Sequence, residues 1–306
     1  MRRFLLRRLM AAVLVLWAVA TIVFLAIHAT GDPIAAAMAS VGMTAGDAER
    51  MRHALGLDKP LVVQYWHFLG QALHGNFGNS FQSGGSAMRL VVDRLPATLE
   101  LAGAALGITI VVSFVLGIAS AYGEGGIVDK FVLYLAALGQ SVPNFVAGPL
   151  LIAVFAVALR LLPVQGLNSF SSVVLPAVTL ALYPTAQITR VLRASILEVI
   201  SADYVRAARA RGTSALRVML KHVTRNALLP VITIVGLQLN VMLGGAVIVE
   251  NVFAWPGVGS LARQALLASD FPVAQSVVLV IAVMVVVVNL ATDIAYAVVD
   301  PRLRYR

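Results

Sequence analysis

Six long stretches of this chain contain no charged residue and are strongly apolar. A helix rises about 1.5 Å per residue, so roughly 20 apolar residues cross the hydrocarbon layer of a bilayer, and each stretch is at least that long. Only 12% of the residues are charged, against about 25% in an ordinary soluble domain. The sequence therefore predicts an all-α, polytopic membrane protein with six transmembrane helices. The predicted spans cover residues 9–31, 101–123, 131–159, 161–189, 226–249 and 271–292.

One further charge-free run, residues 60–88, is not predicted to span the membrane. It is rich in histidines, amides and serines, and its second half is rich in glycine. In hydrocarbon those polar groups would lack partners, at a cost of several kcal/mol for each one. We expect a surface amphipathic helix over residues 62–73, followed by a loop.

The basic residues predict the orientation of the chain. Arg2, Arg3, Arg7 and Arg8 directly precede the first span, which favours a cytoplasmic N-terminus. The apolar core of that span is too long for a cleaved signal peptide. With six spans the C-terminus is also cytoplasmic, and most of the 23 basic residues fall on the cytoplasmic side. Topology thus accounts for the net charge of +9 without nucleic-acid binding.

Several classes of functional site have no pattern in this sequence. The chain has no cysteine, and its five histidines lack metal-ligand spacing. There is no HExxH, GxSxG or phosphate-binding loop, so neither a catalytic nor a metal site is predicted, and any nucleotide energy must come from another chain. Glu100, Glu250 and Asp293 lie near span ends, where they can reach interfacial water. The absence of a deeper ionisable residue argues against an ion-coupled carrier.

Helix-breaking residues interrupt two of the predicted spans. Pro143 and Pro149 lie in the third span, and Pro176 and Pro184 lie in the fourth. Such breaks either line a pathway or kink helices for packing, and the sequence leaves both open. Neutral polar residues in the spans are the candidates for a solute path, although hydrogen bonds between helices are their commoner use. The candidates are Gln140, Asn144, Gln187, Gln238, Asn240 and Asn289.

The segment between the fourth and fifth spans has a helical pattern of its own. Ser201 is a predicted N-cap, and Asp203 in the first turn suits the helix dipole. Tyr204, Val205 and Ala208 can share one side, with arginines projecting elsewhere. Gly212 is a predicted stop, after which Thr213 or Ser214 caps a second helix. The segment is either a docking helix for a partner or a basic linker on lipid headgroups.

This segment resembles the signature loop of permease subunits in ATP-binding-cassette importers. Arg206-Ala207-Ala208 followed by Gly212 keeps the spacing of the loop's E-A-A…G pattern. Arg206 replaces the glutamate, and Leu229-Pro230 comes later than the general pattern places it. Both departures are similar to the peptide/nickel branch, whose loop reads like DYVRTARAKG, then KH and RNALLP. Three further motifs resemble the first permease subunit of that branch. They are LGLDKPLVVQYWHFLGQALHGNFGNSF (55–81), RLPATLEL (94–101) and GGAVIVENVFAWPGVGSL (244–261).

The resemblance implies a type I importer permease fold and a function in the import of peptides, such as di- and oligopeptides or glutathione. A homologous second permease would complete the pathway, and two ATPase subunits would bind ATP and Mg²⁺, leaving this chain non-catalytic and without a cofactor. A periplasmic or lipid-anchored solute-binding protein would dock outside, near the turn at Trp255, Pro256 and Gly257, with Trp255 as a membrane-interface anchor. The implied ATPase-coupling residues are Asp203, Tyr204, Arg206, Ala207, Ala208, Arg209, Gly212 and Thr213.

Nickel or another small solute is the alternative cargo, an ion-coupled carrier or channel is a second alternative, and a membrane-embedded enzyme is a third.

The same resemblance divides the chain into five regions in the bacterial inner membrane. The regions are a cytoplasmic N-terminus (1–8), the first transmembrane helix (9–31), a periplasmic segment with the amphipathic helix (32–97), a five-helix core (98–298) that contains the coupling segment (201–225), and a cytoplasmic C-terminus (299–306).

Overall fold

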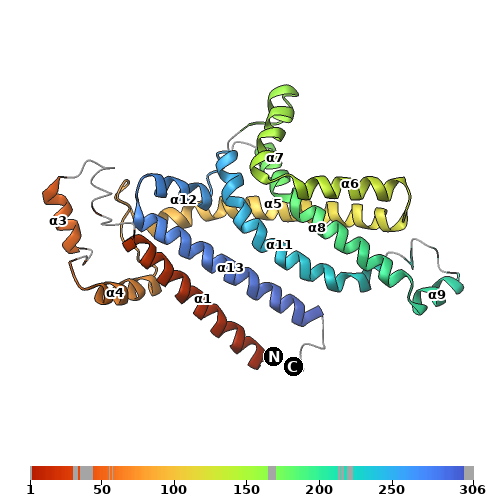
Figure 1. Ribbon diagram of the computed structural model, residues 1–306, viewed down its shortest axis with the longest axis horizontal. Coiled ribbons are helices and arrows are strands. Elements are labelled where there is room, and N and C mark those ends of the chain that lie inside the picture. Colours follow the sequence, from red (N-terminus) through yellow and green to blue (C-terminus); the bar gives the residue numbers. More distant parts are fainter. Residues whose placement is uncertain are drawn as a thin grey trace. The chain divides into compact units, whose positions relative to one another are not determined.

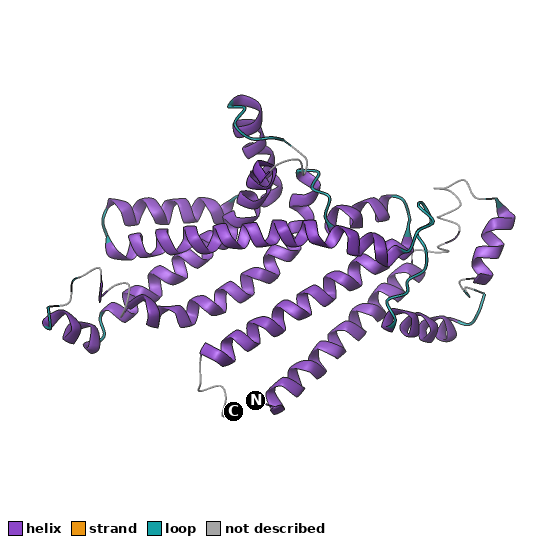
Figure 2. Ribbon diagram, turned by 180° about the vertical axis from the view of Figure 1, so that it is seen from behind, coloured by secondary structure: helices purple, strands orange, loops and turns teal. Residues whose placement is uncertain are grey.

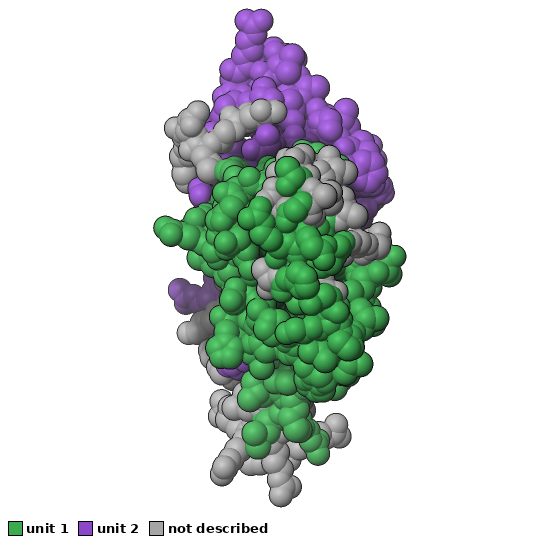
Figure 3. Space-filling model, turned by 90° about the vertical axis from the view of Figure 1, so that its left-hand side faces the viewer, with its two compact units in different colours: residues 1–98, 256–287 green, residues 99–255, 288–306 purple. Residues whose placement is uncertain are grey.

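In the part of the chain that it describes, the computed structural model is built of helices joined by loops and turns. The described residues are 2–29, 34, 44–54, 56, 58–164, 170–212, 214, 217–218 and 223–299. Their only β-type pairing is an isolated bridge between Asn79 and Ser86. The chain divides into two compact units (Figure 3). One contains residues 1–98 and 256–287, and the other contains residues 99–255 and 288–306. The all-α prediction is confirmed for these residues.

Five helices are long and apolar enough to cross a membrane singly, and a bent pair makes a sixth span if it is counted as one (Figure 1). The pair is α6 (Ile127–Ser141) with α7 (Asn144–Leu151) and its π-helical continuation η1 (Ile152–Ala158). Its two parts meet at 108°. The prediction of six spans is thus confirmed in this form. The five single spans lie in α1 (Arg2–Ala29), α5 (Ala87–Tyr122), α8 (Val174–Ile200), α11 (Thr224–Val252) and α13 (Phe271–Val299).

The predicted third and fourth spans were placed wrongly in detail. Residues 131–159 do not form one straight helix, because Pro143 precedes α7 in extended backbone and cannot donate a helical hydrogen bond. The fourth span does not begin at residue 161: residues 161–164 are not helical, and the 3₁₀ turn η2 (Phe170–Val173) leads into α8. Helix α8 then continues through Arg190 and Arg193 to Ile200. The absence of charge therefore marked neither end of this helix.

The unit formed by residues 1–98 and 256–287 joins α1 to three short helices, α3 (Ala45–Ala54), α4 (Leu61–Leu73) and α12 (Val258–Leu267). Helix α4 confirms the predicted short helix at 62–73, and its Gln64 side chain lies 2.9 Å from the His28 ring of α1. The buried Asp270 carboxylate accepts hydrogen bonds from the Ser80 hydroxyl (2.5 Å) and the Phe81 amide (3.2 Å). The unit is thus held by polar contacts between its helices and the loop after α4.

The unit formed by residues 99–255 and 288–306 is arranged around α8. The apolar window of α8 is 67% buried, against 33% or less in the other four single spans. Helix α8 packs against α6, α7 and α11, and Figure 2 shows the same helices from behind. Gly117 of α5 and Gly139 of α6 allow this packing, because a Cβ at either would lie within 3.2 Å of Leu192 or of the Leu182 carbonyl of α8. Helix α8 is therefore the central element to which the candidate site is attached.

Candidate functional site

The connection between α8 and α11, residues 201–223, contains the short helix α9 (Asp203–Ala210). The backbone amides of Val205 and Arg206 donate to the Ala202 carbonyl, at 3.0 and 3.3 Å. The Ser201 hydroxyl instead donates to the Glu198 carbonyl (2.8 Å) and so caps the end of α8. The predicted N-cap role of Ser201 in α9 is therefore wrong. Helix α8 runs further than expected and takes Ser201 as its own C-cap residue.

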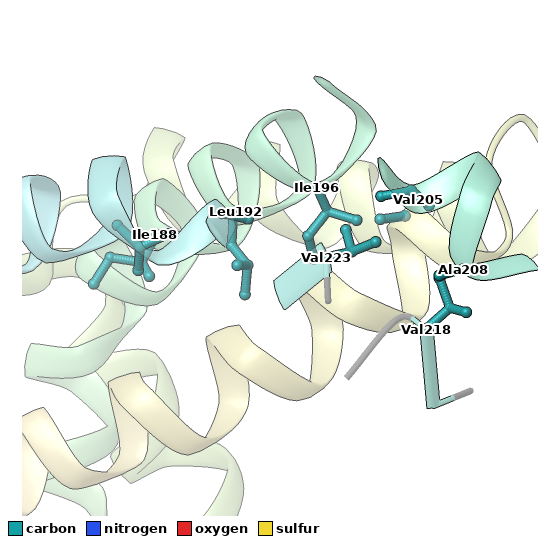
Figure 4. Close-up of a cluster of buried hydrophobic side chains, with 10 residues drawn as sticks. Ile188, Leu192, Ile196, Val205, Ala208, Val218 and Val223 are labelled. Carbon is teal, nitrogen blue, oxygen red and sulfur yellow. The ribbon is translucent and has the colours of Figure 1, made fainter. Parts of the chain in front are cut away.

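Helix α9 has one buried side. Val205 is fully buried and Ala208 is 2% exposed, and both belong to one buried apolar cluster with Ile188, Leu192 and Ile196 of α8, in which Val205 lies near Ile196 and Ala208 beside Val218 (Figure 4). We call this set the anchor cluster; it also contains Ala121, Val218, Val223, Ala227 and Val231. The cluster joins α9 to α5, α8 and the start of α11.

The other side of α9 is open. The Asp203 side chain is 98% exposed and that of Arg206 is 73% exposed. Tyr204, expected on the same side as Val205 and Ala208, is half-exposed instead, and its hydroxyl accepts from the Asn226 amide (2.9 Å). Small and charged side chains on an exposed helix, backed by a buried anchor, form a surface that a protein partner can approach closely.

Gly212 follows α9 and adopts a left-handed backbone conformation, with φ +80°. A Cβ at Gly212 would meet nothing within 4 Å, so the position requires glycine for its backbone angle and not for space. The predicted helix stop is confirmed. Ala207 is exposed. The side chain of Arg209 and the whole of Thr213, both predicted coupling residues, lie outside the described part of the structure.

A buried ion pair next to the anchor cluster was not predicted from the sequence. Arg193 of α8 donates from Nε to Asp129 Oδ1 (2.6 Å) and from Nη2 to Oδ2 (2.7 Å). The Ser120 hydroxyl and the Gly125 amide donate to the same carboxylate, at 2.5 and 2.9 Å. Asp129 is 3% exposed, yet all four donors converge on it. Its only sequence signal was an acid and a base 64 residues apart, each near a span end.

The ion pair and the anchor cluster share two helices. Ser120 and Ala121 are adjacent on α5, and Arg193 and Leu192 are adjacent on α8. Charge-assisted hydrogen bonds in fork geometry fix direction as well as distance. The ends of α5, α6 and α8 are therefore joined by directional polar contacts beside the apolar contacts that hold α9.

Of the six predicted pathway residues, one pair is joined by a hydrogen bond, and two others bond to residues outside the set. Asn240 Nδ2 donates to Asn289 Oδ1 (2.8 Å), and Gln187 Nε2 donates to the Tyr183 hydroxyl (3.0 Å). Gln140 Oε1 accepts from Arg190 Nη1 (2.9 Å).

The two remaining pathway residues lie elsewhere in the same unit. The Asn144 amide faces Gly245 of α11, where a Cβ would lie 3.1 Å from it. Gln238 is buried, and no partner is found for its Oε1 within the described residues. Four of the six candidates therefore take part in hydrogen bonds that join or brace helices.

The turn between α11 and α12 is present, but its tryptophan is not a membrane-interface anchor. The Trp255 side chain is only 2% exposed, and its backbone amide donates to the Glu250 carbonyl (2.8 Å). Pro256 and Gly257 follow, and α12 begins at Val258. Glu250 of α11 is also fully buried, so the expectation that it reaches interfacial water is wrong. Among the described residues, no group of three potential metal ligands occurs.

Comparison with known proteins identifies the family. Residues 113–305 match the family model described as binding-protein-dependent transport system inner membrane component, and residues 1–102 match the model of its N-terminal part. A probable peptide ABC transporter permease of Sinorhizobium fredii is 38% identical, with 99% of each chain covered. A putative peptide permease of Brucella suis is 40% identical, with 99% of each chain covered. The glutathione transport system permease GsiC of Escherichia coli is 37% identical over the whole of both chains.

Solved structures show the same fold. A chain of the inward-facing MetNI methionine ABC transporter matches with a TM-score of 0.59 and 20% identity, over 70% of this chain and 97% of that one. The family matches and the membrane-spanning helices agree on a multi-pass protein of the inner membrane. The chain belongs to the family of inner-membrane permease components of binding-protein-dependent ABC transport systems.

Proposed function

We propose that this chain is a non-catalytic permease subunit of an ATP-driven importer for peptides. Relatives of equal length that are named as peptide and glutathione permeases support this cargo. The observation that carries the mechanism is α9, whose Val205 and Ala208 are buried in the anchor cluster while Asp203 and Arg206 are exposed. A helix held in this way can receive a movement from a partner and pass it to the spans.

In the proposed mechanism α9 docks on one of two ATPase subunits, which bind ATP and Mg²⁺. Closure of the ATPase pair displaces α9, and the anchor cluster carries that displacement into α8 and α5. The Asp129–Arg193 pair extends it to α6, which is joined to α8 by two hydrogen bonds. ATP favours one arrangement of the transporter over the other only because it binds the two arrangements with different affinity. Hydrolysis then resets the cycle.

The proposed assembly sets the orientation of the chain. Both termini and α9 face the cytoplasm, where Arg7, Arg8, Arg206 and Arg211 would lie in accord with the positive-inside rule. A homologous second permease would complete the pathway together with this chain. A solute-binding protein would dock on the outer side, where α4, the loop after it and the 255–257 turn would lie.

The Gly212→Asp substitution tests this function in the complete transporter, reconstituted in proteoliposomes with its ATPase and binding-protein partners. A side chain at φ +80° strains the backbone by roughly 1–2 kcal/mol. The added carboxylate also stands on the surface offered to the ATPase. We expect peptide uptake to be abolished and ATPase association to weaken, with membrane insertion unchanged.

The matched control is Gly84→Asp. Gly84 also has a positive φ (+69°) and open space around its Cβ, but it lies in the loop after α4. This variant is expected to keep ATPase association. Wild-type uptake by the Gly212 variant would refute the docking role of α9. Peptide transport by the purified chain alone, without ATP, would instead identify a carrier or channel.

A further inference from the structure

Arg190 is a positively charged side chain of the candidate membrane-spanning helix α8. It belongs to the candidate span Ser171–Ile200 and lies ten residues, about 15 Å, before its end. Its side chain is exposed, and it donates to the Gln140 amide oxygen of α6 (2.9 Å). No carboxylate of a described residue forms an ion pair with it. Charged residues in membrane spans generally face a protein partner or a watery cavity.

Arg190 belongs to a polar row along one face of α8. Tyr183, Gln187 and Arg190 follow at spacings of four and three, which places them one above another on the helix. All three are half-buried or exposed, whereas Pro184 and Ile188 between them are buried. A polar row is costly against lipid tails, so this face of α8 requires water or polar groups opposite it.

The surroundings of Arg190 offer hydrogen-bond donors in excess of acceptors. Gln140 Nε2 is buried, and none of the described residues accepts its hydrogen bond. Arg190 has five N–H donors, of which the structure places one on Gln140. A group that satisfies this place must accept several hydrogen bonds and carry negative charge. A carboxylate meets both requirements, and the planar guanidinium matches its two oxygens.

The helix break beside Gln140 points to the same place. Gln140 precedes the bend of 108° between α6 and α7, and Gly139 next to it allows α6 to approach the α8 backbone closely. Broken helices are tolerated at membrane depth where protein or a water-filled cavity meets the freed backbone groups. The hydrogen bond to Gln140 thus brings the Arg190 guanidinium close to this bend.

We propose that Arg190 and Gln140 form a subsite that binds the carboxylate of the solute during its passage. This inference rests on the proposed function in peptide import, and it adds a site within the permease that selects anionic solutes. In the proposed orientation the subsite lies in the cytoplasmic half of α8, so it acts late in translocation. Gln187 and Tyr183, further along the same face, suit the uncharged peptide groups that follow.

The experiment compares three peptides in the complete reconstituted transporter. They are trialanine, its C-terminal amide, and the amide of Ala-Asp-Ala, each at a concentration that saturates the binding protein. We expect Arg190→Gln to lower trialanine uptake about tenfold, the value of a charge-assisted hydrogen bond, and to leave trialanine amide unchanged. Arg190→Lys keeps the charge but not the fork and should fall between the two. Uptake of the aspartyl amide tells whether the subsite reads any carboxylate or only the C-terminal one.

Arg160→Gln is the matched control, since it removes an exposed arginine from the non-helical residues 159–164 of the same unit. It should leave the ratio between trialanine and its amide unchanged. An equal loss for all three peptides in Arg190→Gln would overturn the inference, because Arg190 would then pair with a carboxylate of the second permease. No change in the ratio would also overturn it. If neither the wild-type transporter nor the Arg160→Gln control imports any peptide, it is the proposed function in peptide import that is refuted, separately from the subsite.

Discussion

Arg190 and Arg193 lie one turn apart on α8 and meet opposite surroundings. Arg193 is bound at both ends of its fork by the Asp129 carboxylate, which Ser120 and Gly125 also contact. Arg190 donates to an amide oxygen and remains exposed. Arg193 thus forms an ion pair within the protein, whereas no described residue forms one with Arg190. The comparison shows that the surroundings of an arginine, and not its depth alone, indicate its role.

The two arginines also differ in how they can act on the rest of the molecule. Arg193 is tied to α6 and lies next to Leu192 of the anchor cluster, so it moves with α5, α6 and α8 together. Arg190 contacts α6 through one hydrogen bond to a neutral amide oxygen, which a solute carboxylate can replace. We propose that Arg193 positions helices for coupling and that Arg190 binds solute.

The largest effect is expected for Asp129→Leu. This change leaves the Arg193 guanidinium in a site from which its counter-charge is gone, which costs about 3–5 kcal/mol. We expect a large fall in the unfolding free energy of the purified protein, measured by denaturant titration in detergent. In the double variant with Arg193→Met most of the stability should return, because an apolar pair needs no counter-charge. Wild-type stability of Asp129→Leu alone would show that the pair does not form in the membrane.

An intermediate effect is expected for Arg193→Lys. Lysine keeps the charge but cannot donate in parallel to both carboxylate oxygens, so one directional contact is lost. We expect a stability loss of about 1–2 kcal/mol and a larger loss of coupling, seen as ATP hydrolysis that proceeds while peptide uptake falls. The ratio of uptake to hydrolysis is the measurement. A fall in both by the same factor would mean that Arg193 supports folding without a role in coupling.

Much of the fold could be predicted because it depends on local pattern. Apolar stretches of sufficient length located the helices, and the 3.6-residue period placed Val205 and Ala208 together on the buried side of α9. Gly212 as a helix stop followed from its freedom to adopt positive φ. These features require no knowledge of which helices are neighbours.

The features that were missed or wrong depend on tertiary contacts. Asp129 and Arg193 both fall outside the predicted spans, because a charge ends an apolar stretch, and their mutual neutralisation needs α6 and α8 side by side. The burial of Trp255 and Glu250 likewise depends on how the chain turns back after α11. Pro143 was predicted to interrupt a helix, but a proline in the sequence does not give the bend angle of 108°.

The smallest effect on stability is expected for Arg190→Gln. Its side chain is exposed and loses one neutral-acceptor hydrogen bond, so the unfolding free energy should change by no more than about 0.5 kcal/mol. The same denaturant titration, with Arg193→Gln beside it, makes the measurement. Arg193→Gln should cost several kcal/mol, about as much as Asp129→Leu, because it leaves the buried carboxylate without its main donor. If the two glutamine variants lost equal stability, Arg190 would have a fixed partner in the folded protein. It would then not be open to a passing carboxylate, and the difference between the two arginines would disappear.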